Sequence, residues 1–552
     1  MLKLKLTSSL EKIFKDSVFN DISEISSLSA FKNERISFQI AAEIIETETF
    51  SEQYSVNISG ELAEYATVRE VISVPVTIPT FPCGFSDDNN LRTTPGLYPD
   101  LLMPLRYGKT LRVNKDFVSS LWIEIDLRDK GSVCSGVHPL TVTLSNEKET
   151  AEVTLNIEII DASLPDEDIT FSEWFYTDCL ANYYNVEAFS EKHWEIIENF
   201  ARTAVKNGIN LLLTPTFTPP LDTAVGGERL TTQLVGVTLK DGIYEFDFTL
   251  LDRWIEMCNR VGVKYFEIAH FFTQWGAKHT PKVMATVNGE YKKIFGWETD
   301  AVSPEYTLFL RSFIKAFLEH MRARGDDKRC YFHISDEPKL DQLENYKAAK
   351  DSITDLLCGY PIMDALSNYE FYSDGLVDLP IPANNHITPF LENNVQNLWT
   401  YYCCGQWEKV SNRFIAMPSA RNRSIGMQMY KHSIVGFLHW GYNFYNTQYS
   451  YNPIDPYRDT SGDGWVPAGD CFCVYPAPDG TAYETMRVIV FYEALQDVKA
   501  MKLAERLCGK DTVISTIENA FGRKVAFDEC ARTPDEILRV REAVNSLIKN
   551  NI

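Results

Sequence analysis

Residues 329–340 read RCYFHISDEPKL: a short apolar run stops at Ser335 and is followed by two adjacent acids, Asp336 and Glu337. Pro338 then favours a change of direction, because the residue before a proline is disfavoured in helical geometry. In barrels of alternating strands and helices, catalytic residues lie where the strands end. Two neighbouring carboxylates there disfavour each other's ionisation and can hold different protonation states. The stretch therefore predicts a buried strand that delivers an acid pair to the rim of a sheet.

The same residues also have an ordinary structural explanation, which stays open at this point. Asp, Glu and Pro are all favoured in the first turn of a helix, where they cap free N–H groups and complement the helix dipole. Short motifs of this kind often occur by chance. The rest of the chain has to separate the two interpretations.

Eight apolar segments alternate with helix-like stretches in the second part of the chain, and eight is the number of strands in a closed parallel barrel. The expected strands are Ile169–Thr177, Ile209–Phe217, Lys264–Phe272, Cys330–Ile334, Pro361–Leu366, Leu379–Ala383, Leu398–Cys403 and Ile434–Tyr442. The expected helices include Glu191–Lys206, Leu250–Arg260, a helix capped by Ser303, Leu340–Leu357 and Thr485–Leu507. We expect a catalytic (β/α)8 TIM barrel over residues 165–507.

The first 164 residues show a different pattern, with short segments that alternate between apolar and polar residues. Leu2–Leu6, Arg35–Ile40 and Ala151–Ile160 are examples. Such strands, separated by Gly, Asn, Asp and Pro, indicate an antiparallel β-sandwich. We therefore expect a multidomain β plus α/β protein: a sandwich accessory domain over 1–164, the barrel, and a helical C-terminal extension over 508–552.

Composition narrows the choice of partner. The chain has 552 residues and a formal net charge of −23, which argues against nucleic acid or an anionic membrane as the main partner.

Residues 1–17 lack the continuous apolar core of a signal peptide, and no run is long enough to span a membrane. Twelve scattered cysteines without a CxxC pair suggest thiols in a reducing cytoplasm. We expect a cytoplasmic protein; homo-oligomerisation is left open.

The residues that follow the predicted strands are rich in aromatic rings and amides. Flat rings stack on the C–H faces of a sugar, while amides and carboxylates bind its hydroxyl groups. The expected substrate-binding residues are Tyr176, His270, Asn368, Trp440, Tyr442 and Asn443, with Gln274 and Trp275 also at a strand end. His333 lies inside a strand and is expected to be a hydrogen-bonded interior residue. His270 and His439 lack partners at metal-ligand spacing, so we expect neither a metal nor a cofactor.

At this point the chain resembles a known family. The element His333-x-x-Asp336-Glu337-Pro338 resembles the catalytic motif of glycoside hydrolase family 123, the β-N-acetylgalactosaminidases. Further segments resemble the same family in order along the chain: Tyr98–Pro104, Gly436–Asn443, Gly469-Asp470, Tyr475-Pro476 and Arg487. The resemblance covers roughly residues 98–503. It implies an oligosaccharide or glycoconjugate substrate.

The resemblance also implies a mechanism. It implies a retaining, exo-acting β-N-acetylgalactosaminidase in which the 2-acetamido oxygen of the sugar attacks C1. Asp336 would hold the acetamido N–H, and Glu337 would act as general acid and then general base. Two alternatives remain. One is a glycosidase for another β-linked sugar, such as N-acetylglucosamine or galactose; a sugar without an acetamido group would need a second carboxylate, for which Glu267 and Asp364 are the candidates. The other is a non-catalytic carbohydrate-binding barrel.

Overall fold

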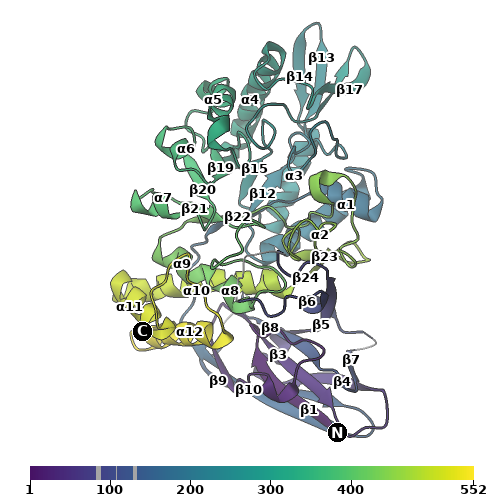
Figure 1. Cartoon of the computed structure of the whole chain (residues 1–552), viewed down its shortest axis with the longest axis vertical. Coiled ribbons are helices and arrows are strands. Elements are labelled where there is room, and N and C mark those ends of the chain that lie inside the picture. The colour runs from purple at the N-terminus through teal and green to yellow at the C-terminus, as the bar shows by residue number, and fades with distance from the viewer. Residues whose placement is uncertain (82–88, 107–108, 129–132) are drawn as a thin grey trace.

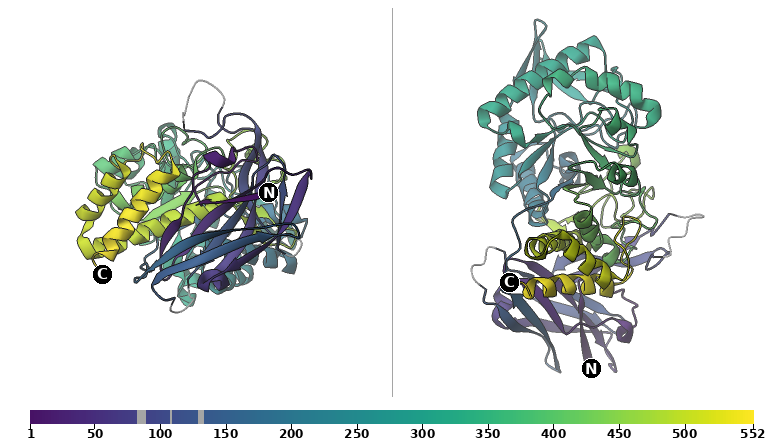
Figure 2. Two further views of the ribbon diagram at one scale, coloured as in Figure 1. Left: turned by 90° about the horizontal axis from the view of Figure 1, so that it is seen from below. Right: turned by 90° about the vertical axis from the view of Figure 1, so that its left-hand side faces the viewer.

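The computed structural model of the chain describes residues 1–81, 89–106, 109–128 and 133–552 (Figure 1). Strands of the N-terminal part lie at one end of the elongated molecule, and a small sheet from residues 236–295 lies at the other. The C-terminal helices lie beside the N-terminal strands in both views that show them from the side (Figures 1 and 2).

The N-terminal region is built from two five-stranded sheets that share one apolar core. Phe38 and Ile123 of the first sheet and Val142 and Leu155 of the second are fully buried in it. The first sheet has the order β1 (Leu2–Ser8), β3 (Arg35–Ile44), β8 (Ser119–Asp126), β5 (Ala66–Val76), β6 (Gly96–Pro104). The second has the order β2 (Ser27–Phe31), β10 (Thr150–Ile160), β9 (Gly136–Ser145), β4 (Ser51–Ser59), β7 (Thr110–Asn114). The alternating pattern of the sequence therefore correctly predicted a β-rich region whose strands have buried inner faces.

Eight short parallel strands follow, one within each segment expected from the sequence. Six form a sheet in the order β18 (Cys330–Tyr331), β15 (Tyr265–Ile268), β12 (Leu211–Thr214), β11 (Thr170–Glu173), β22 (Gly436–His439), β21 (Trp399–Tyr401). The other two, β19 (Met363–Leu366) and β20 (Leu379–Pro382), pair with each other. Isolated parallel bridges, Phe332 to Ile362 and Ala383 to Tyr401, connect the pair to both outer strands of the larger sheet.

One glycine shows how closely these strands pack. A Cβ atom on Gly436 of β22 would lie 2.0 Å from the ring of Trp399 on the neighbouring β21. Any side chain at this position would collide with the indole, so only glycine allows the two strands to pair here.

Helices follow the parallel strands, and the one expected to be capped by Ser303 begins where the sequence places its cap. The helices are α1 (Thr177–Tyr184), α2 (Glu191–Lys206), α3 (Thr249–Val261), α4 (Pro304–Arg324), α5 (Leu343–Asp351), α6 (Glu370–Ser373), α7 (Thr388–Glu392), α8 (Ser419–Arg423), α9 (Ile425–Lys431) and α10 (Met486–Cys508). Ser303 accepts a hydrogen bond from the backbone N–H of Tyr306 and so caps α4. Phe313 and Phe317 on its apolar face are fully buried. The amphipathic pattern thus fixed both the start and the buried side of this helix.

Three expectations need correction. The first strand ends at Glu173 rather than Thr177, and Thr177 begins α1. The helix expected over Leu340–Leu357 is interrupted, with α5 flanked by short 3₁₀ turns. The loops after β12 and β15 together form an unexpected mixed sheet, in which the hairpin of β14 (Ile243–Asp247) and β13 (Gly236–Lys240) pairs in parallel with the hairpin of β16 (Val283–Val287) and β17 (Glu290–Phe295). Each of its hairpins is short and partly polar, so the pairing between two distant segments leaves little trace in the sequence.

The C-terminal helices α11 (Lys510–Phe521) and α12 (Pro534–Lys549) pack against α10 and against each other, and α12 also bonds β2 and β10 of the N-terminal part. Arg541 of α12 donates a 2.6 Å hydrogen bond to Glu34, and Leu101, Trp122 and Val540 belong to one apolar core. The N-terminal sheet, the parallel strands and the C-terminal helices are therefore held together by continuous packing. Within the described ranges, no helix has the length and apolar character needed to cross a lipid bilayer.

Candidate active site

A pocket opens at the carboxyl ends of the parallel strands. It contains about 690 Å³ of space, its open mouth included. Its walls combine three acids, two amides, six aromatic side chains and two thiols: Asp222, Asp336, Glu337, Gln274, Gln448, Trp174, Trp275, Tyr401, Trp440, Tyr449, Trp465, Cys403 and Cys404. Several of these residues come directly at or after a strand end, which is where parallel barrels and sheets place their sites.

The two acids of the sequence motif both line this pocket. Tyr401, the last residue of β21, donates a 2.6 Å hydrogen bond from its hydroxyl to Oε1 of Glu337. The backbone N–H of Glu337 donates to the carbonyl of Ala365 at 3.1 Å, and the carbonyl of Asp336 accepts from the N–H of Trp275 at 2.9 Å. Burial, and next the charge of Glu337, raise the pKa of Asp336 well above its ordinary value. The pair is therefore fixed in place and resists carrying two negative charges.

Strained backbone is concentrated around the same pocket. Asp222, Trp275, Glu337 and Tyr449 all have positive φ angles, of 39°, 59°, 42° and 58°. This region is unfavourable for residues other than glycine, so the surrounding contacts must hold each of them there. Strain of this kind gathers at ligand sites.

A buried charge network lies beneath the acid pair. His333 bonds Oε1 of Glu267 through Nε2 at 2.7 Å and Oδ1 of Asp364 through Nδ1 at 2.9 Å. Burial alone would lower the pKa of His333, but the two hydrogen bonds and the two carboxylate charges raise it to about 9. The imidazole is therefore a cation between two fully buried carboxylates, in agreement with the expectation of an interior histidine. Trp174 of the pocket wall also donates to Glu267, at 2.7 Å, so the network holds that wall in place.

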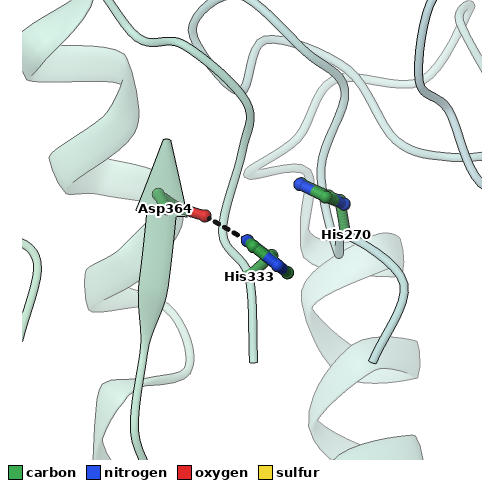
Figure 3. Close-up of side chains that lie close together, drawn as sticks. All are labelled: His270, His333 and Asp364. Atoms are coloured by element: carbon green, nitrogen blue, oxygen red, sulfur yellow. Dashed lines mark hydrogen bonds and ion pairs between the residues drawn. The ribbon is translucent and has the colours of Figure 1, made fainter. Parts of the chain in front are cut away.

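His270 lies against this network, as Figure 3 shows. Its ring is stacked on that of His333, with centroids 4.1 Å apart and an interplanar angle of 14°. Potential ligand atoms of His270, His333 and Asp364 lie within 4.8 Å of one another. However, stacked rings direct their in-plane lone pairs side by side rather than at one point, and His333 uses both nitrogens on carboxylates. The arrangement fits a hydrogen-bonded charge network better than a set of metal ligands.

Of the six substrate-binding residues expected from the sequence, Trp440 lines the pocket. Its indole N–H donates to Oδ2 of Asp470 at 2.8 Å, and its ring lies 5.8 Å from that of Trp465. The two tryptophans give an aromatic part to a pocket lining that also carries carboxylates, a combination suited to a sugar ring.

The other five lie elsewhere. Asn443 is buried and bonds both the backbone N–H and the carbonyl of Tyr176, at 2.8 and 3.1 Å. The hydroxyl of buried Tyr442 donates to the carbonyl of Phe200 at 2.9 Å, and His270 is buried in the network below. Asn368 is half-buried and lies outside the pocket lining. None of the five lines the pocket, and four of them are interior side chains: Tyr176, His270, Tyr442 and Asn443.

Glu267 and Asp364, the second-carboxylate candidates, are also interior residues. Both are fully buried and occupied by His333, and neither lines the pocket. A different acid, Asp222, lines the pocket in addition to Asp336 and Glu337, and it lies in the loop that follows β12. It follows the expected second strand by only five residues, which was the one signal in the sequence. Tyr449 and Trp465, in the long loop after β22, gave no signal at all.

The comparisons with known proteins agree with this geometry. Residues 174–504 match the family model described as glycoside hydrolase 123, catalytic domain. A solved family 123 glycoside hydrolase from Clostridium perfringens, studied for glycolipid glycan hydrolysis, aligns over 100% of this chain and 98% of its own. It has a TM-score of 0.73 at 15% sequence identity, so it supports the fold.

More distant structures include a β-glucuronidase from Parabacteroides merdae, with a TM-score of 0.32, 10% identity, and coverage of 82% of this chain and 52% of its own. An endo-β-1,4-mannanase from Thermotoga petrophila has a TM-score of 0.34, 13% identity, and coverage of 61% and 77%. No curated protein sequence gives a significant match. All the pocket residues named above lie within the matched range 174–504. The chain belongs to glycoside hydrolase family 123.

Proposed function

We propose that this glycoside hydrolase removes terminal β-linked N-acetylgalactosamine with retention of configuration, using the acetamido group of the sugar as the nucleophile. The observation that carries the proposal is the placement of Asp336 and Glu337, adjacent in the chain, in the wall of one pocket. Conventional retaining enzymes hold their two carboxylates about 5 Å apart on either side of the bond, whereas substrate-assisted enzymes dispense with a carboxylate nucleophile.

The lining of the pocket supports a neutral sugar. Among the described residues that line it there is no Lys or Arg, whereas three are acids. A uronic acid would bring a negative charge to this wall without a cation to pair with, and burial of an unpaired charge is costly. Trp440 and Trp465 offer flat faces for the C–H groups of a hexosamine, and Gln274 and Gln448 offer amides for its hydroxyl groups.

The mechanism divides the work between the two acids. The 2-acetamido oxygen attacks C1 while Glu337 donates a proton to the departing glycosidic oxygen, so the C1–O bond breaks as the oxazolinium ring forms. Asp336 accepts the acetamido N–H and stabilises the positive charge of that ring. Glu337 then removes a proton from a water molecule, which attacks C1 and reopens the ring. Burial and the charge of Glu337 raise the pKa of Asp336, so the pair resists carrying two negative charges; the mechanism needs the remaining proton on Glu337 when the sugar binds.

A second candidate function has one observation in its favour. Asp222 also lines the pocket, so it could serve as the nucleophile of a conventional glycosidase that acts on galactose or another sugar without an acetamido group. A non-catalytic carbohydrate-binding protein has less support, since both acids of the motif are present and are held by specific hydrogen bonds.

We also make a proposal about how the parallel strands and the domains are arranged. We infer that the eight parallel strands form one closed (β/α)8 barrel, supported by the two bridges that join the six-stranded and two-stranded sheets. We retain the division into a β-sandwich over 1–164, a catalytic barrel over 165–507 and a helical extension over 508–552.

The first experiment compares nitrophenyl β-glycosides of N-acetylgalactosamine, N-acetylglucosamine and galactose. Substrate assistance predicts hydrolysis only of the acetamido sugars, with N-acetylgalactosamine preferred, and inhibition by a thiazoline analogue of the oxazoline intermediate. Asp336→Asn should remove activity on every substrate. Glu337→Gln should retain more activity on a dinitrophenyl than on a methylumbelliferyl glycoside, because the better leaving group needs less protonation. Equal cleavage of the plain galactoside would exclude the acetamido nucleophile.

A further inference from the structure

Asp222 is an acid of the pocket wall that the proposed mechanism does not use. It lies in the loop after β12, apart in sequence from both Asp336 and Glu337. Its negative charge is one of the causes, after burial and Glu337, that raise the pKa of Asp336. Asp222 is therefore part of the same electrostatic environment as the acid pair.

Two other loops hold Asp222 in its strained conformation. Its backbone N–H donates to the side-chain oxygen of Gln274, which follows β15, and its carbonyl accepts from the hydroxyl of Ser450 at 2.7 Å. The backbone N–H of Tyr449 bonds its carboxylate. Both Tyr449 and Ser450 belong to the long loop after β22, and both have positive φ angles. Asp222 and these two residues that bond it all have unfavourable backbone conformations, so surrounding contacts must hold them there. The fold therefore fixes the position of the Asp222 carboxylate.

One oxygen of this carboxylate has no protein partner within the described part of the chain. Oδ2 of Asp222 is shielded from solvent and receives no hydrogen bond there. Burial raises the pKa of Asp222 to about 6, although the charge of Arg229 and the N–H of Tyr449 act in the opposite direction. Burying a hydrogen-bond acceptor without a donor is unfavourable. Because the fold holds Oδ2 of Asp222 in this state at the pocket wall, a bound ligand can supply the missing donor.

We propose that Asp222 is a specificity-determining residue, which accepts hydrogen bonds from ring hydroxyl groups of the sugar bound in this pocket. The inference rests on the proposed function, because that function makes the ligand a sugar. A carboxylate can accept from two neighbouring hydroxyl groups at once, and a site built to bond a hydroxyl group discriminates strongly against analogues that lack it. Asp222 thereby selects the sugar, while Asp336 and Glu337 carry out the chemistry.

The test measures kcat and KM for wild type and Asp222→Asn on nitrophenyl β-N-acetylgalactosaminide and its 3-, 4- and 6-deoxy analogues. At least one deoxy analogue should lose tenfold or more in kcat/KM with wild type, and that penalty should shrink several-fold in Asp222→Asn. The wild-type KM should also fall as the pH rises through about 6, since the ionised carboxylate is the better acceptor, and Asp222→Asn should lack this dependence.

Asp455→Asn is the matched control. Asp455 accepts a 3.0 Å hydrogen bond from the N–H of Tyr457 in the loop after β22, is exposed, and lies outside the pocket lining. It should show the wild-type penalties for every deoxy analogue. Identical penalties in Asp222→Asn and wild type would reduce Asp222 to a loop anchor and overturn the inference. Loss of kcat on all substrates, with recovery by added azide, would make it the nucleophile and also overturn it.

A separate arm distinguishes this failure from failure of the proposed function. If wild type hydrolyses no glycoside, the proposed function fails, and binding of free N-acetylgalactosamine is then measured by calorimetry. Weaker binding to Asp222→Asn than to wild type and Asp455→Asn would still support the inference. Equal affinity for the three proteins, or no binding to any of them, would overturn it.

Discussion

Tyr401 at the end of β21 donates a 2.6 Å hydrogen bond to Oε1 of Glu337. Glu337 lies two residues after Ser335, where the apolar run that begins in β18 stops. The contact joins residues that are 64 positions apart. It leaves the second oxygen of Glu337 for the glycosidic oxygen, and it fixes the direction in which the carboxyl group points. Tyr401 therefore acts as a positioning residue for the proposed general acid.

Replacement of Tyr401 by Phe should reduce kcat by roughly tenfold to a hundredfold, the loss expected for one hydrogen bond to a charged group. KM should change much less, because the lost contact orients Glu337 rather than the sugar. Tyr402→Phe is the control: its hydroxyl donates to Asn422 away from the pocket. Equal kcat values for the two variants would show that the hydrogen bond to Glu337 has no role in turnover.

Trp440 should contribute to sugar binding, whereas Tyr442, two residues further on, should not. Trp440→Ala should raise KM by roughly threefold to tenfold, the effect of about 0.5–1.5 kcal/mol of stacking. Tyr442→Phe removes a hydrogen bond to Phe200 in the interior and should affect thermal stability but not KM. A rise in KM with Tyr442→Phe alone would reverse the placement of these two residues.

The stacked histidines should differ sharply in what they contribute to stability. His333→Leu leaves Glu267 and Asp364 buried without their cation and should cost about 3–5 kcal/mol. His270→Leu removes a ring of the same size at a site where no described residue bonds its nitrogens, so it should cost much less. Denaturant unfolding of the two variants compares them directly, and similar losses would argue against a charged network.

The same network should make stability depend on pH. The pKa of His333 is raised from 6.5 to about 9 in the folded protein. Its contribution to stability is therefore complete below about pH 6.5 and is lost as the pH rises through about 9. The Tm of wild type should fall over this range by more than the Tm of His333→Leu. Parallel pH profiles of the two proteins would show that His333 is neutral in the fold.

Asp100 should be essential for joining the N-terminal sheet to the catalytic part. It is fully buried on β6 and accepts hydrogen bonds of 2.7 and 2.9 Å from the guanidinium of Arg487 on α10. Asp100→Ala should cost about 3–5 kcal/mol because it leaves a buried cation unpaired. Asp161→Ala removes an exposed partner of Lys32 and should cost about 0–1 kcal/mol. Thermal unfolding would measure both.

The sequence by itself determined much of the local structure and the proximity of the two acids in the proposed mechanism. The periods of 2.0 and 3.6 residues placed a strand within each of the eight expected segments, the bounds of α2 and the start of α4, because side-chain burial follows those periods directly. Asp336 and Glu337 are joined by a peptide bond, so their proximity needed no fold. The segments around Asp100, Gly469, Tyr475 and Arg487 were also visible as motifs, and the structure brings them into one buried hydrogen-bonded cluster.

Only the tertiary structure decided which side chains line the pocket. Adjacent residues at a strand end point in different directions, so an uncertainty of one or two residues exchanges a wall residue such as Trp440 for an interior one such as Tyr442. Asp222, Tyr449 and Trp465 reach the pocket from two long loops that are more than 200 residues apart in the chain. Their positions depend on contacts between those loops, and no local pattern of apolar and polar residues encodes such a contact.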